Sequence, residues 1–109
     1  MKLSTISIIL LFFGISTAFS QYNIQGKITD QQNQALPFAN IVLYTIDSKE
    51  NPKGATSDDL GEYRLENVES GKYRLEISML GFETKKIKAF ELNSNKTFNI
   101  TLKEETQTL

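Results

Sequence analysis

Apolar and polar residues alternate over several short stretches of this chain, most regularly between residues 72 and 79. The same alternation occurs over 62–66 and 97–102, and in a weaker form over 24–28 and 86–90. Successive side chains of a β-strand point to opposite faces, so apolar residues at every second position predict a strand with one buried face. The chain is therefore expected to fold into strands. In the most regular stretch the apolar positions are Tyr73, Leu75, Ile77 and Met79.

Polar residues, glycines and prolines separate these stretches and mark turns. Because the spacing is short and no stretch has helical periodicity, we expect an all-β fold, a seven-stranded antiparallel β-sandwich of Greek-key type. The expected strands lie at 24–28, 38–44, 54–57, 62–66, 72–79, 86–90 and 97–102.

The segment 38–44 is apolar in both phases, with Ala39, Ile41 and Leu43 in one phase and Val42 and Tyr44 in the other. This pattern predicts a strand that is buried on both faces or lies at the centre of the sandwich.

The first 20 residues have the layout of a secretory signal peptide. Lys2 provides a positive start, residues 3–16 form a run without charge, and Ala18 and Ser20 are small residues placed before Gln21. The apolar run is shorter than the roughly 20 residues of a typical membrane span. An uncleaved anchor is the alternative. We expect cleavage after Ser20, a single domain over 21–102 and a loose polar tail over 103–109.

The chain has no histidine and no cysteine. Zinc and copper sites, which usually use imidazole or thiolate ligands, are therefore not expected. Ser–His and Cys–His nucleophilic pairs cannot form, and disulfides cannot stabilise the fold. The net charge of −1 gives no reason to expect nucleic acid or an anionic membrane as a partner. We expect no cofactor and no enzymatic activity, although carboxylates, lysine and tyrosine remain available.

Two adjacent acids, Asp58 and Asp59, precede Leu60 and Gly61 and form the most obvious candidate site. A calcium loop needs oxygen ligands at alternate positions, and Leu60 occupies a position where a ligand would be required. An aspartate that binds the backbone two residues on, followed by a glycine with positive φ, is typical of a tight turn. The sequence favours a four-residue hairpin turn, with a metal site or a carboxylate-dependent hydrolase as alternatives.

Gly71 and Gly81 are expected in two further turns, at 67–71 and 80–82. Tyr63 and Tyr73 share the inward phase of their strands and are expected in the core. Phe82 and Phe90 lie at a turn and on the polar phase of a weak strand, which makes them a candidate contact surface. Arg64 and Arg74 are expected to form ion pairs with glutamates across neighbouring strands.

Five short motifs in order resemble the carboxypeptidase-regulatory-like domain. The family pattern combines G-x-V-x-D, a proline-led apolar strand, T-D-x-x-G-x-[FY], G-x-Y-x-L and S-x-x-G-[FY]. This sequence departs from it by one additional residue, Ser57. The matching segments are Gly26–Asp30, Pro37–Val42, Thr56–Tyr63, Gly71–Leu75 and Ser78–Phe82.

The resemblance implies a transthyretin-like (prealbumin-like) sandwich that is an accessory module rather than a catalyst. Such domains often stand at the N-terminus of TonB-dependent receptors and related outer-membrane β-barrel proteins of Bacteroidetes. The resemblance therefore implies export to the periplasm, association with the outer membrane, and a protein partner there or a barrel domain in cis. Family receptors continue into a plug and a barrel, and these 109 residues do not. The chain is expected to be either part of a receptor or a separate exported module.

Two hypotheses for function follow. The first is a monomeric, non-catalytic interaction module of the outer-membrane receptor type. The second is a free-standing secreted module that binds carbohydrate or peptide along the edge containing Phe82, Phe90 and the third expected strand.

Overall fold

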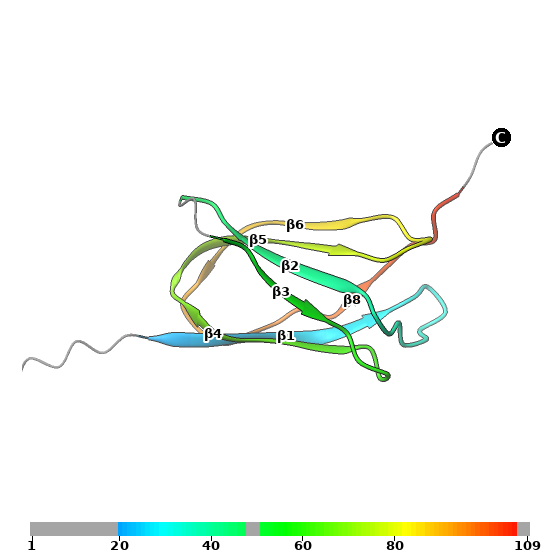
Figure 1. Ribbon diagram of the computed structural model, residues 1–109, viewed down its shortest axis with the longest axis horizontal. Coiled ribbons are helices and arrows are strands. Elements are labelled where there is room, and N and C mark those ends of the chain that lie inside the picture. The colour runs from blue at the N-terminus through cyan, green and yellow to red at the C-terminus, as the bar shows by residue number, and fades with distance from the viewer. Residues whose placement is uncertain (1–19, 48–50, 107–109) are drawn as a thin grey trace, which may run out of the picture.

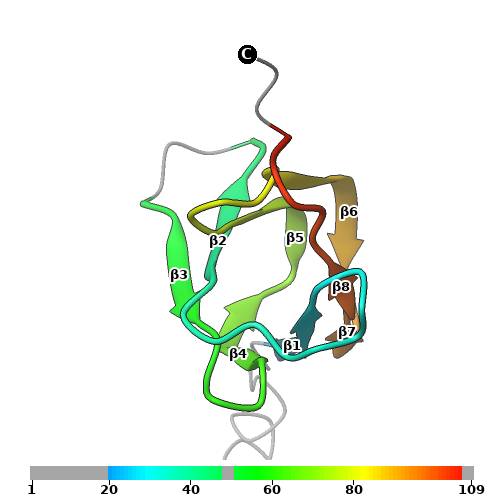
Figure 2. The same cartoon turned by 90° about the vertical axis from the view of Figure 1, so that its right-hand side faces the viewer.

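The computed structural model describes residues 20–47 and 51–106. The expected signal peptide and the last three residues of the expected tail lie outside the described residues. Two sheets pack face to face, as Figures 1 and 2 show, and the described residues contain no helix. The predicted all-β sandwich is therefore confirmed. Within the described ranges, no helix has the length and apolar character needed to cross a membrane.

The first sheet has the strand order β4-β1-β7, with β8 pairing further along β1. Its strands are β1 (Gln21–Thr29), β4 (Glu62–Glu69), β7 (Lys96–Thr97) and β8 (Ile100–Thr101). The second sheet has the order β3-β2-β5-β6. Its strands are β2 (Asn40–Thr45), β3 (Lys53–Thr56), β5 (Gly71–Ser78) and β6 (Lys85–Leu92).

The core lies between the sheets and contains most of the apolar residues that the alternation predicted to be buried. It also contains Leu36, Val68 and Leu92, which lie outside the expected strands. Tyr63 and Tyr73 are 3% and 8% exposed, so their predicted place in the core is confirmed. β2 lies between β3 and β5, as expected of a central strand. Only one of its faces is fully buried, because Val42 and Tyr44 on the other face are partly exposed. The largest fully buried side chains are Ile24, Ile28, Ile41, Leu43, Leu75, Ile77, Leu92, Leu102 and Val68.

The last predicted strand differs from expectation in two ways. It is divided into β7 and β8, which brings the described strands to eight, and both pieces pair with β1 in the parallel direction. The prediction of a purely antiparallel sandwich is therefore wrong. Asparagine side chains supplement this parallel contact. Asn95 Oδ1 accepts a hydrogen bond from the Asn23 amide (2.9 Å) and Asn99 Oδ1 accepts one from the Lys27 amide (3.0 Å).

β4 forms no hairpin with the strand before it or with the strand after it, because it lies in the other sheet. β3 and β5 belong to the second sheet, and β4 between them belongs to the first. The prediction of a hairpin at Asp58–Gly61 is therefore wrong.

The prediction that Arg64 and Arg74 form ion pairs with glutamates on neighbouring strands is also wrong. Each arginine instead pairs with a glutamate two residues on in its own strand. These pairs are Arg64 with Glu66 (3.2 Å) and Arg74 with Glu76 (3.7 Å).

The beginning of the expected tail is bonded to the sandwich. The Glu83 amide donates to the Lys103 carbonyl (2.7 Å), and the Glu105 amide donates to the Gly81 carbonyl (2.9 Å). The expectation of a loose tail is therefore wrong for Lys103–Glu105. Two backbone hydrogen bonds hold this segment against the loop between β5 and β6. The sequence did not indicate this contact, because the alternation of apolar and polar residues ends at Leu102.

Four segments meet at the end of the sandwich opposite Gln21, on the right in Figure 1. The pairing of Asn40 with Thr56 and with Ser78 places the start of β2 beside the ends of β3 and β5. We call this end, made of residues 30–39, 57–61, 79–84 and 103–106, the loop end. Figure 2 looks directly onto it.

Candidate functional site

The acid pair lies in a tight turn at the loop end. Asp58 Oδ1 accepts hydrogen bonds from the amides of Leu60 (3.0 Å) and Glu62 (2.9 Å), and the Gly61 amide donates to the Asp58 carbonyl (2.9 Å). Asp59 is exposed. The Asp58 carboxylate thus serves the backbone of its own turn. Among the described residues, no group of three or more acidic side chains is arranged to hold a metal ion.

Gly61 attaches this turn to the first sheet. Its φ is +76°, and its carbonyl accepts a 2.7 Å hydrogen bond from the Ile28 amide. A Cβ at this position would lie 2.5 Å from the Ile28 carbonyl oxygen. Both the backbone conformation and the close approach therefore require glycine. The turn links two sheets instead of two paired strands.

The other two glycines that the sequence placed in turns, Gly71 and Gly81, lie at different kinds of connection: Gly71 where the chain passes from one sheet to the other, and Gly81 in a turn between two strands of the same sheet. Ser70 and Gly71 carry the chain from β4 into β5, with φ +158° at Gly71. Gly81 has φ +87° in the turn closed by the hydrogen bond from the Phe82 amide to the Met79 carbonyl (3.0 Å).

Phe82 and Phe90 do not form the exposed surface that the sequence suggested. Both are partly buried and pack against the core. Phe82 precedes β6 and Phe90 lies near its end, and the Phe90 ring centroid is 5.1 Å from that of Phe98. The prediction was wrong because it rested on the polar phase of β6 alone. Phe98, on the facing sheet, covers the Phe90 ring at the edge of the sandwich.

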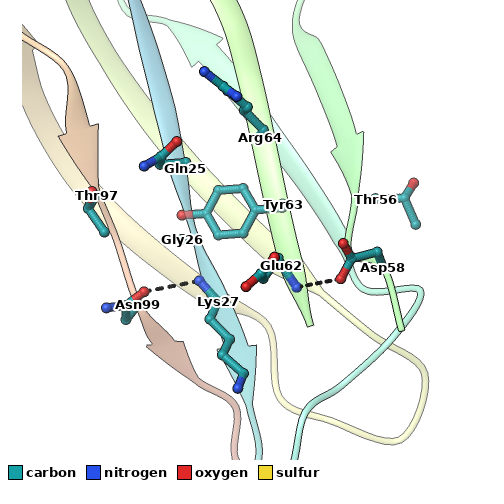
Figure 3. Close-up of a pocket in the computed structure, with 10 residues that line it drawn as sticks. All are labelled: Gln25, Gly26, Lys27, Thr56, Asp58, Glu62, Tyr63, Arg64, Thr97 and Asn99. Atoms are coloured by element: carbon teal, nitrogen blue, oxygen red, sulfur yellow. Dashed lines mark hydrogen bonds between the residues drawn. The ribbon is translucent and has the colours of Figure 1, made fainter. Parts of the chain in front are cut away.

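A groove of about 610 Å³ lies on the outer side of the first sheet (Figure 3). Its lining contains two basic side chains, Lys27 and Arg64, and two acidic ones, Asp58 and Glu62. The sequence did not indicate this groove because its residues come from four separate segments that only the sheet order brings together. Its other lining residues are Gln25, Gly26, Thr56, Tyr63, Thr97 and Asn99.

Exposed apolar side chains gather at the loop end. In the described part of the chain four large apolar side chains are exposed, and Phe38 (73%), Leu60 (63%) and Leu80 (99%) belong to the loop end. The fourth, Ile46 (42%), follows β2 at the opposite end. Leu60 and Leu80 are central residues of the turns closed by Gly61 and Phe82.

Phe38 has an unusual backbone conformation, with φ +65°. Its amide donates to the Ser57 carbonyl (3.0 Å). The buried Ser57 hydroxyl fixes the adjacent chain, since it donates to the Leu36 carbonyl (2.7 Å) and accepts from the Ala39 amide (2.8 Å). The sequence placed Phe38 in a strand because it continues the apolar run. The structure instead turns it outward before β2 begins.

Solved structures with the same fold come from proteins of different kinds. The wild-type catechol 1,2 dioxygenase of Acinetobacter radioresistens has a TM-score of 0.62 at 11% identity, covering 82% of this chain and 53% of that one. A DUF3823 family protein from Parabacteroides merdae has a TM-score of 0.63 at 17% identity, with coverages of 80% and 48%. At these identities the likeness shows the fold alone.

A third similar structure is a proposed carbohydrate binding protein from Bacteroides uniformis, with a TM-score of 0.60 at 17% identity and coverages of 75% and 41%. The chain spans about half or less of each of these three proteins. No curated protein matches the sequence.

A family model described as the carboxypeptidase regulatory-like domain matches residues 23–103. The match begins inside β1 and ends one residue after the last buried core residue, Leu102, so it covers all of the sandwich except the first two residues of β1. The resemblance of the five sequence motifs is thereby confirmed. The chain belongs to the carboxypeptidase regulatory-like domain family.

Proposed function

We propose that this chain is a non-catalytic, exported interaction module that acts on the periplasmic side of the outer membrane. The observation that carries the proposal is the set of exposed apolar side chains at the loop end, Phe38, Leu60 and Leu80. Covering a side chain of this size releases about 1.5–3 kcal/mol, so a surface that contacts all three gains substantial binding energy. A contact surface is the use that best accounts for apolar side chains held at turn tips.

Export is supported by the N-terminal layout, with Lys2, the uncharged run at 3–16 and the small residues before Gln21. The receptor-type role is supported by family membership, since related domains precede outer-membrane barrels. The module would act either in cis, beside a barrel domain, or as a separate periplasmic protein. In both cases the chain is a monomer whose loop end contacts its partner.

A tagged full chain expressed in a Bacteroidetes host tests this proposal. Cell fractionation should place the protein in the periplasmic or outer-membrane fraction, and mass spectrometry should find a new N-terminus at Gln21. A photoreactive residue at position 38 or 80 should then give cross-linked products that the same residue at position 46 does not. A cytoplasmic, unprocessed protein would contradict export, and equal labelling from all three positions would contradict a role for the loop end.

The groove on the first sheet favours a second candidate function, carbohydrate binding. Amide and charged side chains such as Gln25, Arg64 and Glu62 can hydrogen-bond sugar hydroxyls, and a solved protein of similar fold is a proposed carbohydrate binder. Titration with an oligosaccharide panel, followed by tyrosine fluorescence, tests this function. Binding that Gln25→Ala weakens and Lys88→Ala leaves unchanged would support it. The absence of any response would remove it.

A further inference from the structure

The packing of the sandwich does not explain why residue 38 is a phenylalanine. Its φ of +65° is a conformation that side chains with a Cβ rarely adopt, and its ring is 73% exposed. The backbone is therefore strained, and burial of the ring does not compensate for the strain. Asparagine or glycine would satisfy the same backbone at lower cost. An aromatic ring held outward in this position indicates a contact outside the sandwich.

Leu60 and Leu80 share this outward placement on separate turns. Leu80 is 99% exposed, and a Cβ built on the adjacent Gly81 would meet no atom within 4 Å. The Leu80 side chain is therefore not packed against the rest of the loop end, and the loops that carry Phe38, Leu60 and Leu80 are three different ones in Figure 2. The three exposed side chains thus belong to three separate loops of the loop end, those before β2, between β3 and β4, and between β5 and β6.

We propose that the loop end inserts Phe38, Leu60 and Leu80 into the surface of a lipid bilayer. This inference rests on the proposed interaction function and names the bilayer as the partner. A protein partner would need a matching pocket for each projecting side chain. The interfacial region of a bilayer accepts separate apolar side chains without any matching shape, and aromatic rings are favoured there.

The charges at the loop end indicate which bilayer is preferred. Its four segments carry several acidic residues and a single lysine, Lys103. This acidic surface is repelled by anionic headgroups, so insertion is expected to favour zwitterionic lipid. The acidic residues are Asp30, Asp58, Asp59, Glu83, Glu104 and Glu105.

Tryptophan substitution provides a direct test because the chain contains no tryptophan. The full chain carrying Leu80→Trp is mixed with phosphatidylethanolamine–phosphatidylcholine vesicles. Its emission should shift to shorter wavelength, and bromine-labelled acyl chains should quench it. The control is the full chain carrying Ile46→Trp, whose reporter lies at the opposite end and should show neither effect. The apolar segment 3–16 precedes Gln21, which lies at the same end of the sandwich as Ile46, so any affinity of this segment for lipid would favour the Ile46→Trp reporter and would not produce the response expected of Leu80→Trp.

A second substitution separates membrane contact from folding. In the Leu80→Trp chain, Phe38→Asn should lower the vesicle partition coefficient between about tenfold and a hundredfold, the effect of removing one apolar anchor. Its thermal midpoint should not fall, because asparagine accepts the left-handed backbone conformation. Vesicles enriched in phosphatidylglycerol should bind the Leu80→Trp chain more weakly at low salt and recover as salt is added.

The proposal is overturned if the two tryptophan reporters respond alike, or if neither responds to vesicles. It is also overturned if Phe38→Asn leaves partitioning unchanged. If position 80 cross-links to a periplasmic protein while its tryptophan ignores lipid, the bilayer proposal fails and the interaction module remains. Failure of both the cross-linking and the lipid experiments removes the proposed function as well.

Discussion

The hydroxyl group of Tyr63 donates a 2.7 Å hydrogen bond to the backbone carbonyl oxygen of Phe98. Tyr63 lies in β4 and Phe98 lies between β7 and β8, so this bond joins the two edges of the first sheet across β1. Gly26 of β1 is the register partner of Tyr63, and its missing side chain leaves the space that this contact occupies. One tyrosine and one glycine thus fix the last segment of the sandwich.

Removing the Tyr63 hydroxyl should weaken the fold. We expect Tyr63→Phe to lower the free energy of unfolding by about 1–2 kcal/mol, because the Phe98 carbonyl loses its donor in a partly buried setting. Urea denaturation followed by circular dichroism measures the change. Tyr44→Phe is the matched control, since it keeps the ring that stacks 4.1 Å from Arg74, and it should stay within about 0.5 kcal/mol of the parent. Equal losses from both variants would contradict this role.

Adding one methyl group to Gly26 should be more damaging than removing the hydroxyl. The Cβ of Gly26→Ala would overlap the Phe98 carbonyl oxygen and lie 2.9 Å from the Tyr63 hydroxyl, which forces β7 away from β1. We expect a loss of about 3 kcal/mol in the free energy of unfolding. The control is Gly54→Ala in the edge strand β3, where the new Cβ lies 3.7 Å from its nearest neighbour. A Gly26→Ala domain as stable as the control would be inconsistent with this packing.

The pH dependence of stability should reveal the buried phenol. Desolvation by burial raises the pKa of Tyr63 above its ordinary value of about 10. As the pH rises, the Tyr63 hydroxyl therefore loses its proton in the unfolded chain before it does so in the folded one. The contribution of the protonated Tyr63 hydroxyl to stability is complete below about pH 10 and declines as the pH rises further. Urea midpoints measured from pH 8 upward should show this decline, and Tyr63→Phe should reduce it. A Tyr63→Phe profile parallel to that of the parent would contradict the prediction.

The two adjacent acids should have very different effects on stability. We expect Asp58→Ala to cost about 1–2 kcal/mol, because the amides of Leu60 and Glu62 lose their acceptor. Asp59→Ala should change stability by less than about 0.5 kcal/mol, since Asp59 is exposed. Thermal denaturation of both variants, with and without calcium, measures this difference. Stabilisation of the parent by calcium would instead support the metal site that the sequence left as an alternative.

Substitution of the strained residue Phe38 should stabilise the fold, whereas the substitutions described above destabilise it or leave it unchanged. Phe38→Asn is expected to raise the free energy of unfolding by about 0.5–1 kcal/mol, because asparagine tolerates the left-handed backbone conformation better than phenylalanine. Chemical denaturation measures the change. A destabilised Phe38→Asn domain would mean that the exposed ring contributes to folding after all.

Much of the sandwich was predictable because strand periodicity is a local property. The apolar phase of β5 follows directly from Tyr73, Leu75 and Ile77, and these residues are buried as expected. The turn at Asp58–Gly61 also has a local signal, since an aspartate and a following glycine provide the acceptor and the positive φ. The family was recognisable because five such local signals occur in a fixed order.

The pairing partners of the strands and the exposure of some side chains were not predictable, because both depend on residues distant in the sequence. The pattern of its own strand predicts that Phe90 is exposed, but Phe98 on the opposite sheet covers it. The apolar run around Phe38 predicts that it is buried, but the Ser57 hydrogen bonds turn the chain before β2 and leave the ring in solvent.

The sequence alone determined that the chain forms strands, which face of most strands is apolar, and which family it belongs to. The tertiary structure decided which strands pair, that β7 and β8 run parallel to β1, and that Phe38, Leu60 and Leu80 reach the same end. The physical reason is that alternation specifies only the two faces of each strand. Sheet order and loop-end surface arise from hydrogen bonds and packing between segments far apart in the chain.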